Sequence, residues 1–338
     1  MNRRNDVKFL IAGQIQREFI IDVNGRATSN QPGGSLLYAA AALHYWGEKA
    51  GLLAVIDHSV PATWIEALIK KGLDARGIKT TDEALDLRAF QAYLDERTCL
   101  YDNPAAIYAS HRLTFPQELL DYQYTPEDGS LDSLSHYSRL LLEKIPDEYM
   151  EAAAAHICPL DGDSQIKLVA MLEKGSIRNI TLQPHRSTMV PERIGDVVVL
   201  CKDATAIFVK ETELRDLFRI RAHDLWEMTA ALCSYGCRAV VVKRQQGGYL
   251  LHDAYSSQKY LVPDYPVLAS DPRGENEVFC GAFLTAYQHT YDPLSAAITG
   301  SATASLKREA SGPFSLSASL PGLAEARMET IRNRVVHV

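Results

Sequence analysis

Residues 271–283 read Asp-Pro-Arg-Gly-Glu-Asn-Glu-Val-Phe-Cys-Gly-Ala-Phe. Gly274 suits a tight turn, because glycine accepts backbone conformations that other residues avoid. Apolar residues then recur with helical spacing at positions 278, 279, 282, 283 and 286. The spacing predicts a turn at Gly274, followed by a helix whose first turn carries the acidic residues Glu275 and Glu277.

Composition limits the classes of protein to which the chain can belong. Its 338 residues are enough for one large α/β domain, and 46% hydrophobic with 23% charged residues is typical of a globular protein. The net charge of −7 argues against nucleic acid or a membrane surface as a partner. Six scattered cysteines form no Cys-x-x-Cys pair, and although Cys233 and Cys237 have a zinc spacing, we expect structural thiols in a cytoplasmic protein.

Predicted strands alternate with predicted helices along the chain. Short apolar runs predict buried strands at residues 7–13, 52–56, 180–182, 206–209 and 239–242. Helical patterns occupy residues 38–46, 61–71, 164–173, 213–219 and 224–234. This alternation is typical of a mainly parallel sheet that is covered by helices on both faces.

The segment 271–283 resembles the signature of the ribokinase/PfkB carbohydrate kinases, which is usually Asp-Thr-Thr-Gly-Ala-Gly-Asp-x-Phe with a following Gly-Phe or Gly-Ala-Phe. The residues that keep this frame are Asp271, Gly274, Phe279, Gly281, Ala282 and Phe283. Gly33-Gly34 before an Ala-rich helix, residues 72–78, and the Ala-rich stretch from 302 to Gly312 are similar to other family segments in the same order. The resemblance therefore covers nearly the whole chain.

This resemblance implies a single ribokinase-like domain over residues 1–338. Its mostly parallel central sheet would carry helices on both faces, and a small β-sheet lid would come from about residues 14–32 and 84–118. Residues 19–23 and 90–94 alternate apolar and polar, so we expect each to be a strand of the lid sheet. An exposed face of the lid would be available to a homodimer partner or to a substrate.

The signature also implies roles for its residues. In the family, the Gly-Ala-Gly turn directs backbone N–H groups at the transferring phosphoryl group, and the aspartate that follows deprotonates the acceptor hydroxyl. The resemblance thus implies Glu277 as the catalytic base and Gly274 as part of the anion hole, with Glu275 and Asn276 beside the cofactor. Alternatively, Glu277 favours the dipole of the helix and has no catalytic role.

The substrate end of the family pattern falls on the first strand and on the Gly-Gly helix. The family has Gly-x-x-x-x-Asp after its first strand, and this chain has Glu18 at the position of that aspartate. Gly33 and Gly34 precede Tyr38, which stands where the family carries a substrate-binding Asn. The resemblance implies that these four residues border the substrate, with Tyr38 either stacked on a ring-shaped ligand or filling the pocket as core.

The nucleotide end shows a further set of changes. The family's Asn-x-x-Glu aligns with residues 210–213, which keep Glu213 and replace the Asn with Lys210. The family's Thr-x-Gly-x-x-Gly aligns with residues 243–248, where Lys243 replaces the Thr and Gly248 remains. The resemblance implies ATP at these positions and Mg²⁺ at Glu213.

Arg273 is a third basic residue at a position that is neutral in the family, and we expect it to lie with Lys210 and Lys243 beside the cofactor. We expect at least one of these three basic residues to lie within salt-bridge distance of a glutamate of the same cleft, namely Glu275, Glu277 or Glu213. Two hypotheses follow. The first is a PfkB-type kinase that transfers phosphoryl from ATP to a hydroxyl of a sugar or nucleoside. The second is a catalytically weak or inactive protein, a pseudokinase, that binds a ligand or partner through a rewired cleft.

Overall fold

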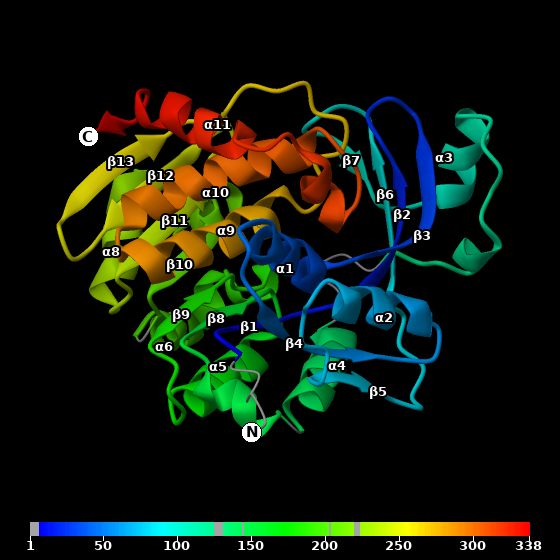
Figure 1. Ribbon diagram of the computed structural model, residues 1–338, viewed down its shortest axis with the longest axis horizontal. Coiled ribbons are helices and arrows are strands. Elements are labelled where there is room, and N and C mark those ends of the chain that lie inside the picture. Colours follow the sequence, from blue (N-terminus) through cyan, green and yellow to red (C-terminus); the bar gives the residue numbers. More distant parts are fainter. Residues whose placement is uncertain (1–6, 125–130, 144, 203, 220–223) are drawn as a thin grey trace.

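The computed structural model describes residues 7–124, 131–143, 145–202, 204–219 and 224–338 (Figure 1). At its centre is a sheet with the strand order β14-β13-β12-β11-β10-β9-β8-β1-β4-β5. Its strands are β1 (Phe9–Ala12), β4 (Ala50–Ile56), β5 (Ile78–Thr80), β8 (Ala154–Ile157), β9 (Asn179–Leu182), β10 (Ala206–Lys210), β11 (Ala239–Lys243), β12 (Tyr249–Asp253), β13 (Gln258–Val262) and β14 (Val336–His337). Neighbours from β11 to β5 are parallel, and β12, β13 and β14 pair antiparallel, so the mostly parallel sheet is confirmed.

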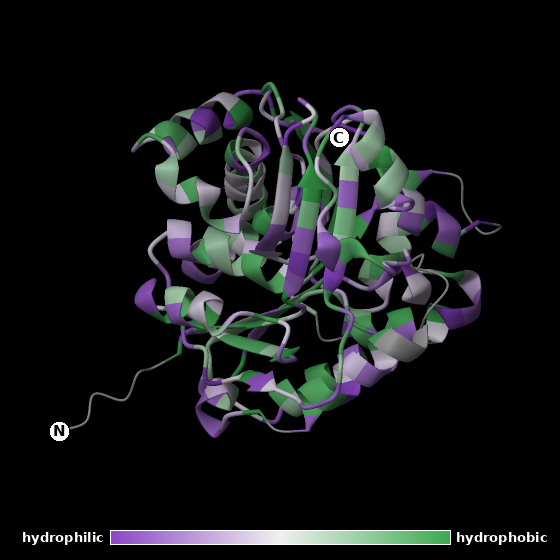
Figure 2. Cartoon of the chain, turned by 90° about the vertical axis from the view of Figure 1, so that its right-hand side faces the viewer, coloured by the Kyte–Doolittle hydropathy of each residue, from purple (hydrophilic) through white to green (hydrophobic). Residues whose placement is uncertain are grey.

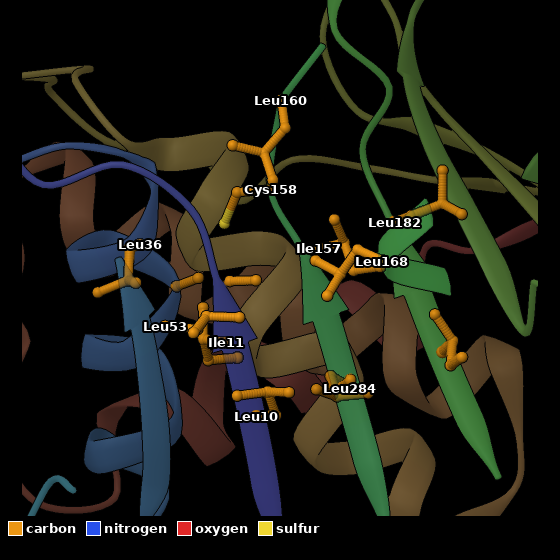
Figure 3. Close-up of a cluster of buried hydrophobic side chains, with 14 of the residues drawn as sticks. Leu10, Ile11, Leu36, Leu53, Ile157, Cys158, Leu160, Leu168, Leu182 and Leu284 are labelled. Carbon is orange, nitrogen blue, oxygen red and sulfur yellow. The ribbon is translucent and has the colours of Figure 1, made fainter. Parts of the chain in front are cut away.

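Helices cover both faces of this sheet. They are α1 (Ser35–Tyr45), α2 (Ala62–Lys70), α4 (Leu131–Leu142), α5 (Gly162–Leu172), α6 (Ile194–Lys202), α7 (Glu211–Leu217), α8 (Leu225–Ser234), α9 (Glu275–Thr290), α10 (Pro293–Arg308) and α11 (Leu323–Arg332). In β10, Ile207 joins a core with α5, α7 and α8, whereas the next residue, Phe208, joins a second core with α9 and α10. Side chains that alternate along a strand point to opposite faces, so each face packs its own helical layer. Figure 3 shows part of the first core, around β1, β4, β8 and β9.

A second, smaller sheet forms the lid. Its order is β3 (Ala27–Gly33), β2 (Gln16–Ile21), β6 (Arg88–Tyr93) and β7 (Cys99–Leu100). The parallel pairing of β2 with β6 sets Phe19 opposite Phe90. The prediction that these two segments are strands of one small sheet is therefore confirmed.

One face of the lid sheet is covered by the chain itself. Phe19 and Phe90 are buried there beneath Tyr108 of α3 (Pro104–Ser110) and Leu119 of the following 3₁₀ segment, Gln117–Leu119. Figure 2 shows the molecule with the side that carries the lid sheet and α3 in Figure 1 turned toward the viewer. The chain itself supplies the cover for this apolar face, and a homodimer through the lid stays a prediction.

Within the described residues, no helix combines the length and the apolar character that a membrane span needs.

Candidate functional site

A cleft of about 440 Å³ lies between the lid and the carboxyl ends of the central strands. Gln14 follows β1, Pro159 follows β8 and His185 follows β9, and all three line the cleft. The remaining lining comes from α1, α4, the lid and the signature: Gln16, Ser35, Tyr38, 84–91, Tyr101, 122–124, Leu134, His136, Tyr137, Arg273 and Glu277. This edge is where α/β sheets bind ligands.

The signature places the start of α9 at the same edge. Gly274 has φ 77°, a left-handed conformation that favours glycine, and α9 begins at the next residue. Asn276 in its first turn lines a small cavity with Gln183, Lys210 and Lys243, which lie at or just after the ends of β9, β10 and β11. The predicted turn and helix are thus found where ligands of such sheets bind.

Glu277 borders the large cleft. In the part of the chain that the structure describes, its carboxylate has neither a hydrogen bond nor an ion pair, and its side chain is partly exposed. Burial, and then the charge of Glu277, raise the pKa of the buried Cys158 thiol, which directly follows β8. A partly exposed carboxylate without a partner can accept a proton from a bound hydroxyl.

Glu18, in contrast, is wholly engaged with the protein. One carboxylate oxygen accepts from the backbone N–H of Gly34 at 2.9 Å and from Nε of Arg273 at 2.8 Å, and the other accepts from the Tyr38 hydroxyl at 2.7 Å. The side chain is 1% exposed and lies so close over Gly33 that an added Cβ there would be 2.0 Å from its carboxyl carbon. Glu18 therefore ties the lid to α1 and to the signature instead of lining the cleft.

Tyr38 lies at the junction of these groups. Its ring packs on the turn so closely that a Cβ at Gly274 would lie 2.2 Å away, and the side chain is 1% exposed. Burial, then the neighbouring Glu18, raise the pKa of Tyr38 well above its usual value. Tyr38 borders the cleft, but it is buried in an apolar cluster with residues of α9 and α10.

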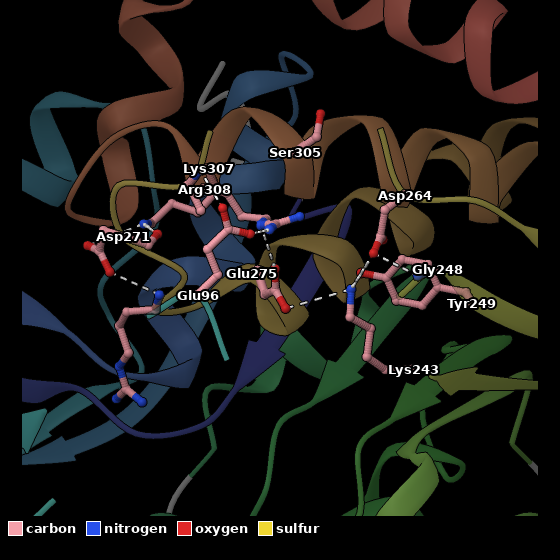
Figure 4. A network of polar contacts seen from close by, with 12 residues as sticks. Glu96, Lys243, Gly248, Tyr249, Asp264, Asp271, Glu275, Ser305, Lys307 and Arg308 are labelled. Carbon is pink, nitrogen blue, oxygen red and sulfur yellow. Dashed lines mark hydrogen bonds and ion pairs between the residues drawn. The ribbon is translucent and has the colours of Figure 1, made fainter. Parts of the chain in front are cut away.

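Several ion pairs connect Glu275, in the first turn of α9, with basic residues of neighbouring elements (Figure 4). Nζ of Lys243 is 3.6 Å from Glu275 and 3.2 Å from Asp264. Glu275 also lies 3.4 Å from Nε of Arg308, whose Nη2 binds Glu96 of the lid at 2.5 Å. The predicted salt bridge between a basic residue and a glutamate of this cleft is confirmed, because Lys243 pairs with Glu275.

Glu213 and Gly248 serve neighbouring backbone turns. Glu213 is 5% exposed; it accepts from the backbone N–H of Lys210 at 2.8 Å and lies 3.4 Å from the Nζ of that lysine. Gly248 has φ 73° and donates its N–H to Asp264 at 2.7 Å. Among the described residues, no three side chains of His, Cys, Asp or Glu are grouped to hold a metal.

We compared the chain with known protein families, curated proteins and solved structures. No family model matches the chain. A curated relative, the cytidine kinase of Thermococcus kodakarensis, is 24% identical over 282 residues, which cover 82% of this chain and 87% of the relative. The nucleoside kinase of Burkholderia thailandensis in complex with inosine superposes with a TM-score of 0.67 at 16% identity, covering 96% of this chain and 99% of that one. A putative ribokinase II from E. coli in complex with ATP and Mg²⁺ gives 0.65 at 19% identity, covering 97% and 99%.

The chain has the ribokinase fold.

The residues of this ribokinase fold can be tested against the ATP and Mg²⁺ that the resemblance implies. Lys210 and Lys243 face the first turn of α9, where the buried Oδ1 of Asn276 has no hydrogen-bond partner. Two ammonium groups beside a helix N-terminus fit the phosphates of a nucleotide. Mg²⁺ is usually held by phosphates and one or two carboxylates. The resemblance assigns the metal to Glu213, whose carboxylate is 5% exposed and engaged by Lys210. Glu275, already paired with Lys243, carries a charge that opposes a phosphate at this position.

The sequence reasoning missed several residues of the site. Lys307 and Arg308, at the end of α10, hold the turn before α9, and Glu96 of the lid pairs with Arg308. Tyr101 and Tyr124 stack in the cleft with ring centroids 5.2 Å apart. The position of Lys307 and Arg308 in the Ala-rich stretch that resembles a family segment was the available signal for these two residues. No local pattern connected the two tyrosines with the cleft.

Proposed function

We propose that this protein is a kinase that transfers a phosphoryl group from ATP to a hydroxyl of a nucleoside or sugar. The observation that carries the proposal is the position of Glu277, a carboxylate without a partner among the described residues, in a cleft of suitable size at the start of α9. The ribokinase fold and the similarity to a cytidine kinase support it. Among the two acceptor classes we favour a nucleoside, because aromatic rings in the cleft offer a surface on which a base can stack.

The acceptor would lie between the lid and the strand ends. The amides of Gln14 and Gln16 offer hydrogen bonds to its hydroxyl groups, and the stacked pair of Tyr101 and Tyr124 offers a ring face to a base. Glu277 would accept the proton of the attacking hydroxyl as the oxygen bonds to phosphorus. Closure of the lid over the acceptor would exclude water, which otherwise competes as the phosphoryl acceptor.

Mg-ATP, when bound, supplies the transferable phosphoryl group and a cation that neutralises its charge. Lys210 and Lys243 would hold the phosphates, and Glu213 would provide a carboxylate to the metal. The N-terminus of α9, after Gly274, would stabilise negative charge there. To bind phosphate, Lys243 must exchange its ion pair with Glu275 for one with the nucleotide.

The test is phosphoryl transfer from Mg-ATP to a panel of cytidine, uridine, inosine, ribose and fructose. Glu277→Gln keeps the shape of the side chain and removes the base, so transfer should fall by about 10²–10⁴-fold. Glu325→Gln, on the exposed part of α11, is the matched control and should leave the rate unchanged. A Glu277→Gln variant as active as the wild type would refute the role of the base, and a wild-type protein without transfer to any acceptor would refute the kinase.

One observation favours a second candidate, a weak or inactive kinase-fold protein that binds a ligand. The carboxylate of Glu275 stands among the phosphate-binding groups and is paired with Lys243 and Arg308. A variant with Gly-Ala-Gly-Asp at positions 274–277 separates the two candidates by calorimetry. Under the second candidate, this variant binds Mg-ATP and the wild type does not, whereas under the first the wild type already binds it.

A further inference from the structure

One edge of the Arg273 guanidinium is fixed by the protein. Its Nε donates to Glu18 at 2.8 Å and its Nη2 donates to Gln16, also at 2.8 Å. Both acceptors belong to β2 of the lid, and Glu18 is buried. The planar fork of an arginine cannot turn when two of its nitrogens are held in this way. The direction of the remaining nitrogen, Nη1, is therefore set in advance.

Nη1 of Arg273 is free to bind a ligand. Within the described part of the chain no hydrogen bond to this atom is present, and the atom is not among the buried polar atoms that lack a partner. Arg273 lines the large cleft together with Glu277, and its side chain is 22% exposed. Two N–H groups of a charged side chain thus face the cleft without a partner in the protein. A guanidinium in this state favours an anion that offers two oxygens, such as a phosphate.

Because Arg273 lines the same cleft as Glu277, the reaction itself indicates which anion Arg273 binds. If Glu277 removes the proton of the acceptor, the phosphorus must approach the same acceptor oxygen to within bonding distance. A cation that shares the cleft with Glu277 can therefore reach the phosphoryl group during its transfer and on the product. The chain also carries Glu275 and Asn276 where the resemblance implied close backbone contact with phosphate. A fixed arginine can replace the stabilisation that those side chains impede.

We propose that Arg273 is a catalytic residue that binds the transferring phosphoryl group, and afterwards the phosphate of the product, through Nη1. This inference rests on the proposed kinase function and extends it by one residue that the resemblance does not supply. In the step, the acceptor oxygen forms a bond to phosphorus, the bond from phosphorus to the leaving oxygen of ATP breaks, and the proton of the acceptor goes to Glu277. Arg273 donates hydrogen bonds throughout and undergoes no covalent change.

The alternative is that Arg273 only neutralises Glu18 and ties the lid to the signature. Two variants separate the roles. Arg273→Lys keeps a positive charge for Glu18 but loses the fork, and the double variant Glu18→Gln/Arg273→Gln removes both charges without leaving a buried carboxylate unpaired. Arg193→Lys, at an arginine paired with Asp163 and Asp196, is the matched control. Thermal unfolding establishes that each variant is folded.

The binding test compares a neutral compound with its phosphate ester by calorimetry. The probes are cytidine with cytidine 5′-monophosphate, and ribose with ribose 5-phosphate. In at least one pair the wild type should bind the ester, and both Arg273 variants should bind it at least tenfold more weakly while affinity for the neutral compound changes less than threefold. Equal losses for ester and neutral compound, or a wild type that binds neither ester, would overturn the inference.

The activity test distinguishes a failure of this inference from a failure of the kinase proposal. With Mg-ATP and the best acceptor, Arg273→Lys should lower kcat by at least tenfold with a smaller change in KM for the acceptor. If the wild type transfers phosphate and Arg273→Lys has the same kcat, Arg273 is structural and the kinase proposal stands. If the wild type transfers none and still binds an ester through Arg273, the kinase proposal fails while the phosphate site stands.

Discussion

A buried ion pair between Lys307 and Asp271 fixes the turn that precedes α9. Breaking this pair provides a quantitative test of the structure. Lys307 and Asp271 are both 0% exposed, with Nζ 3.5 Å from the carboxylate. The same ammonium donates to the backbone carbonyls of Asp271 at 3.1 Å and Ala310 at 2.8 Å. Burial lowers the pKa of Lys307, and the charge of Asp271 opposes this shift. The ammonium is therefore surrounded by a carboxylate and two carbonyl oxygens, whose negative charge and partial charges it balances.

Substitution of Lys307 by Met removes the charge and leaves Asp271 buried without a partner. At 3.5 Å and an effective dielectric constant of about 20, the lost attraction is about 5 kcal/mol, and breaking a buried pair typically costs about 3–5 kcal/mol. With an unfolding entropy of about 2.1 cal/mol/K per residue, 338 residues give about 0.7 kcal/mol/K. The Tm should therefore fall by about 4–7 °C.

The assay is thermal unfolding, monitored by circular dichroism, for the variants of a double-mutant cycle. The variant Asp271→Asn/Lys307→Met leaves no buried charge, so it should lose at least about 2 kcal/mol less than the sum of the two single variants. Arg186→Met, at an exposed pair with Asp216 of 3.9 Å, is the control and should shift Tm by about 1 °C or less. A fall in Tm below 2 °C for Lys307→Met, or strictly additive single effects, would refute the reasoning.

Three further predictions concern pH, the turn and the lid. Burial lowers the pKa of His156 from 6.5 to about 3, so the unfolded chain takes up this proton at a higher pH than the folded chain. The free energy of unfolding should therefore fall as the pH drops from 6.5 toward 3, by about 3 kcal/mol at pH 4.5. In denaturant titrations at several pH values, His156→Asn should flatten this dependence, and His58→Asn, at an exposed histidine, should leave it unchanged. Gly274→Ala should lower Tm more than Gly322→Ala, because both glycines have positive φ but only the first has an aromatic ring 2.2 Å from the added Cβ; equal losses would count against the packed turn. Glu96→Gln should speed hydrogen exchange at the backbone amide that donates to it at 3.3 Å, and an unchanged exchange rate would show that this lid contact is weak.

The fold was accessible from the sequence because its signals are local. Apolar runs of strand length, helical stripes and glycine at helix ends each report on a few neighbouring residues, and Gly274 with the stripe after it predicted the turn and α9 correctly. Alternation of strands and helices then implied the parallel sheet. Residues 19–23 and 90–94 also predicted lid strands, which the structure has at Gln16–Ile21 and Arg88–Tyr93.

The cover of the lid escaped the sequence reasoning for a physical reason. The stretch after β6 is polar and rich in tyrosine, with interrupting prolines, so it gives no clear period. In the structure Pro104 begins α3, and Tyr108 and Leu119 pack on the lid sheet, whereas Tyr101 and Tyr124 stack in the cleft. These contacts join residues that are distant in sequence, and their formation depends on tertiary packing that no local pattern encodes.

The residues of the site divided in a similar way. The resemblance placed a basic group and an acidic group in one cleft, so the pairing of Lys243 with Glu275 could be anticipated from charge alone. It could not anticipate that Glu18 would be enclosed by Gly34, Tyr38 and the signature arginine, because that depends on the register in which β2 meets the turn.

The three acidic residues of the signature have three different environments, and this difference bears on which of them can take part in chemistry. Asp271 is buried against Lys307, and Glu275 lies between Lys243 and a second cation. Both of these carboxylates are therefore engaged by cations of the protein. Glu277 alone of the three has no ion pair in the described structure, and it alone borders the large cleft. The ion pairs thus hold the first two carboxylates in place, and Glu277 is the signature carboxylate that can reach an acceptor hydroxyl in the cleft.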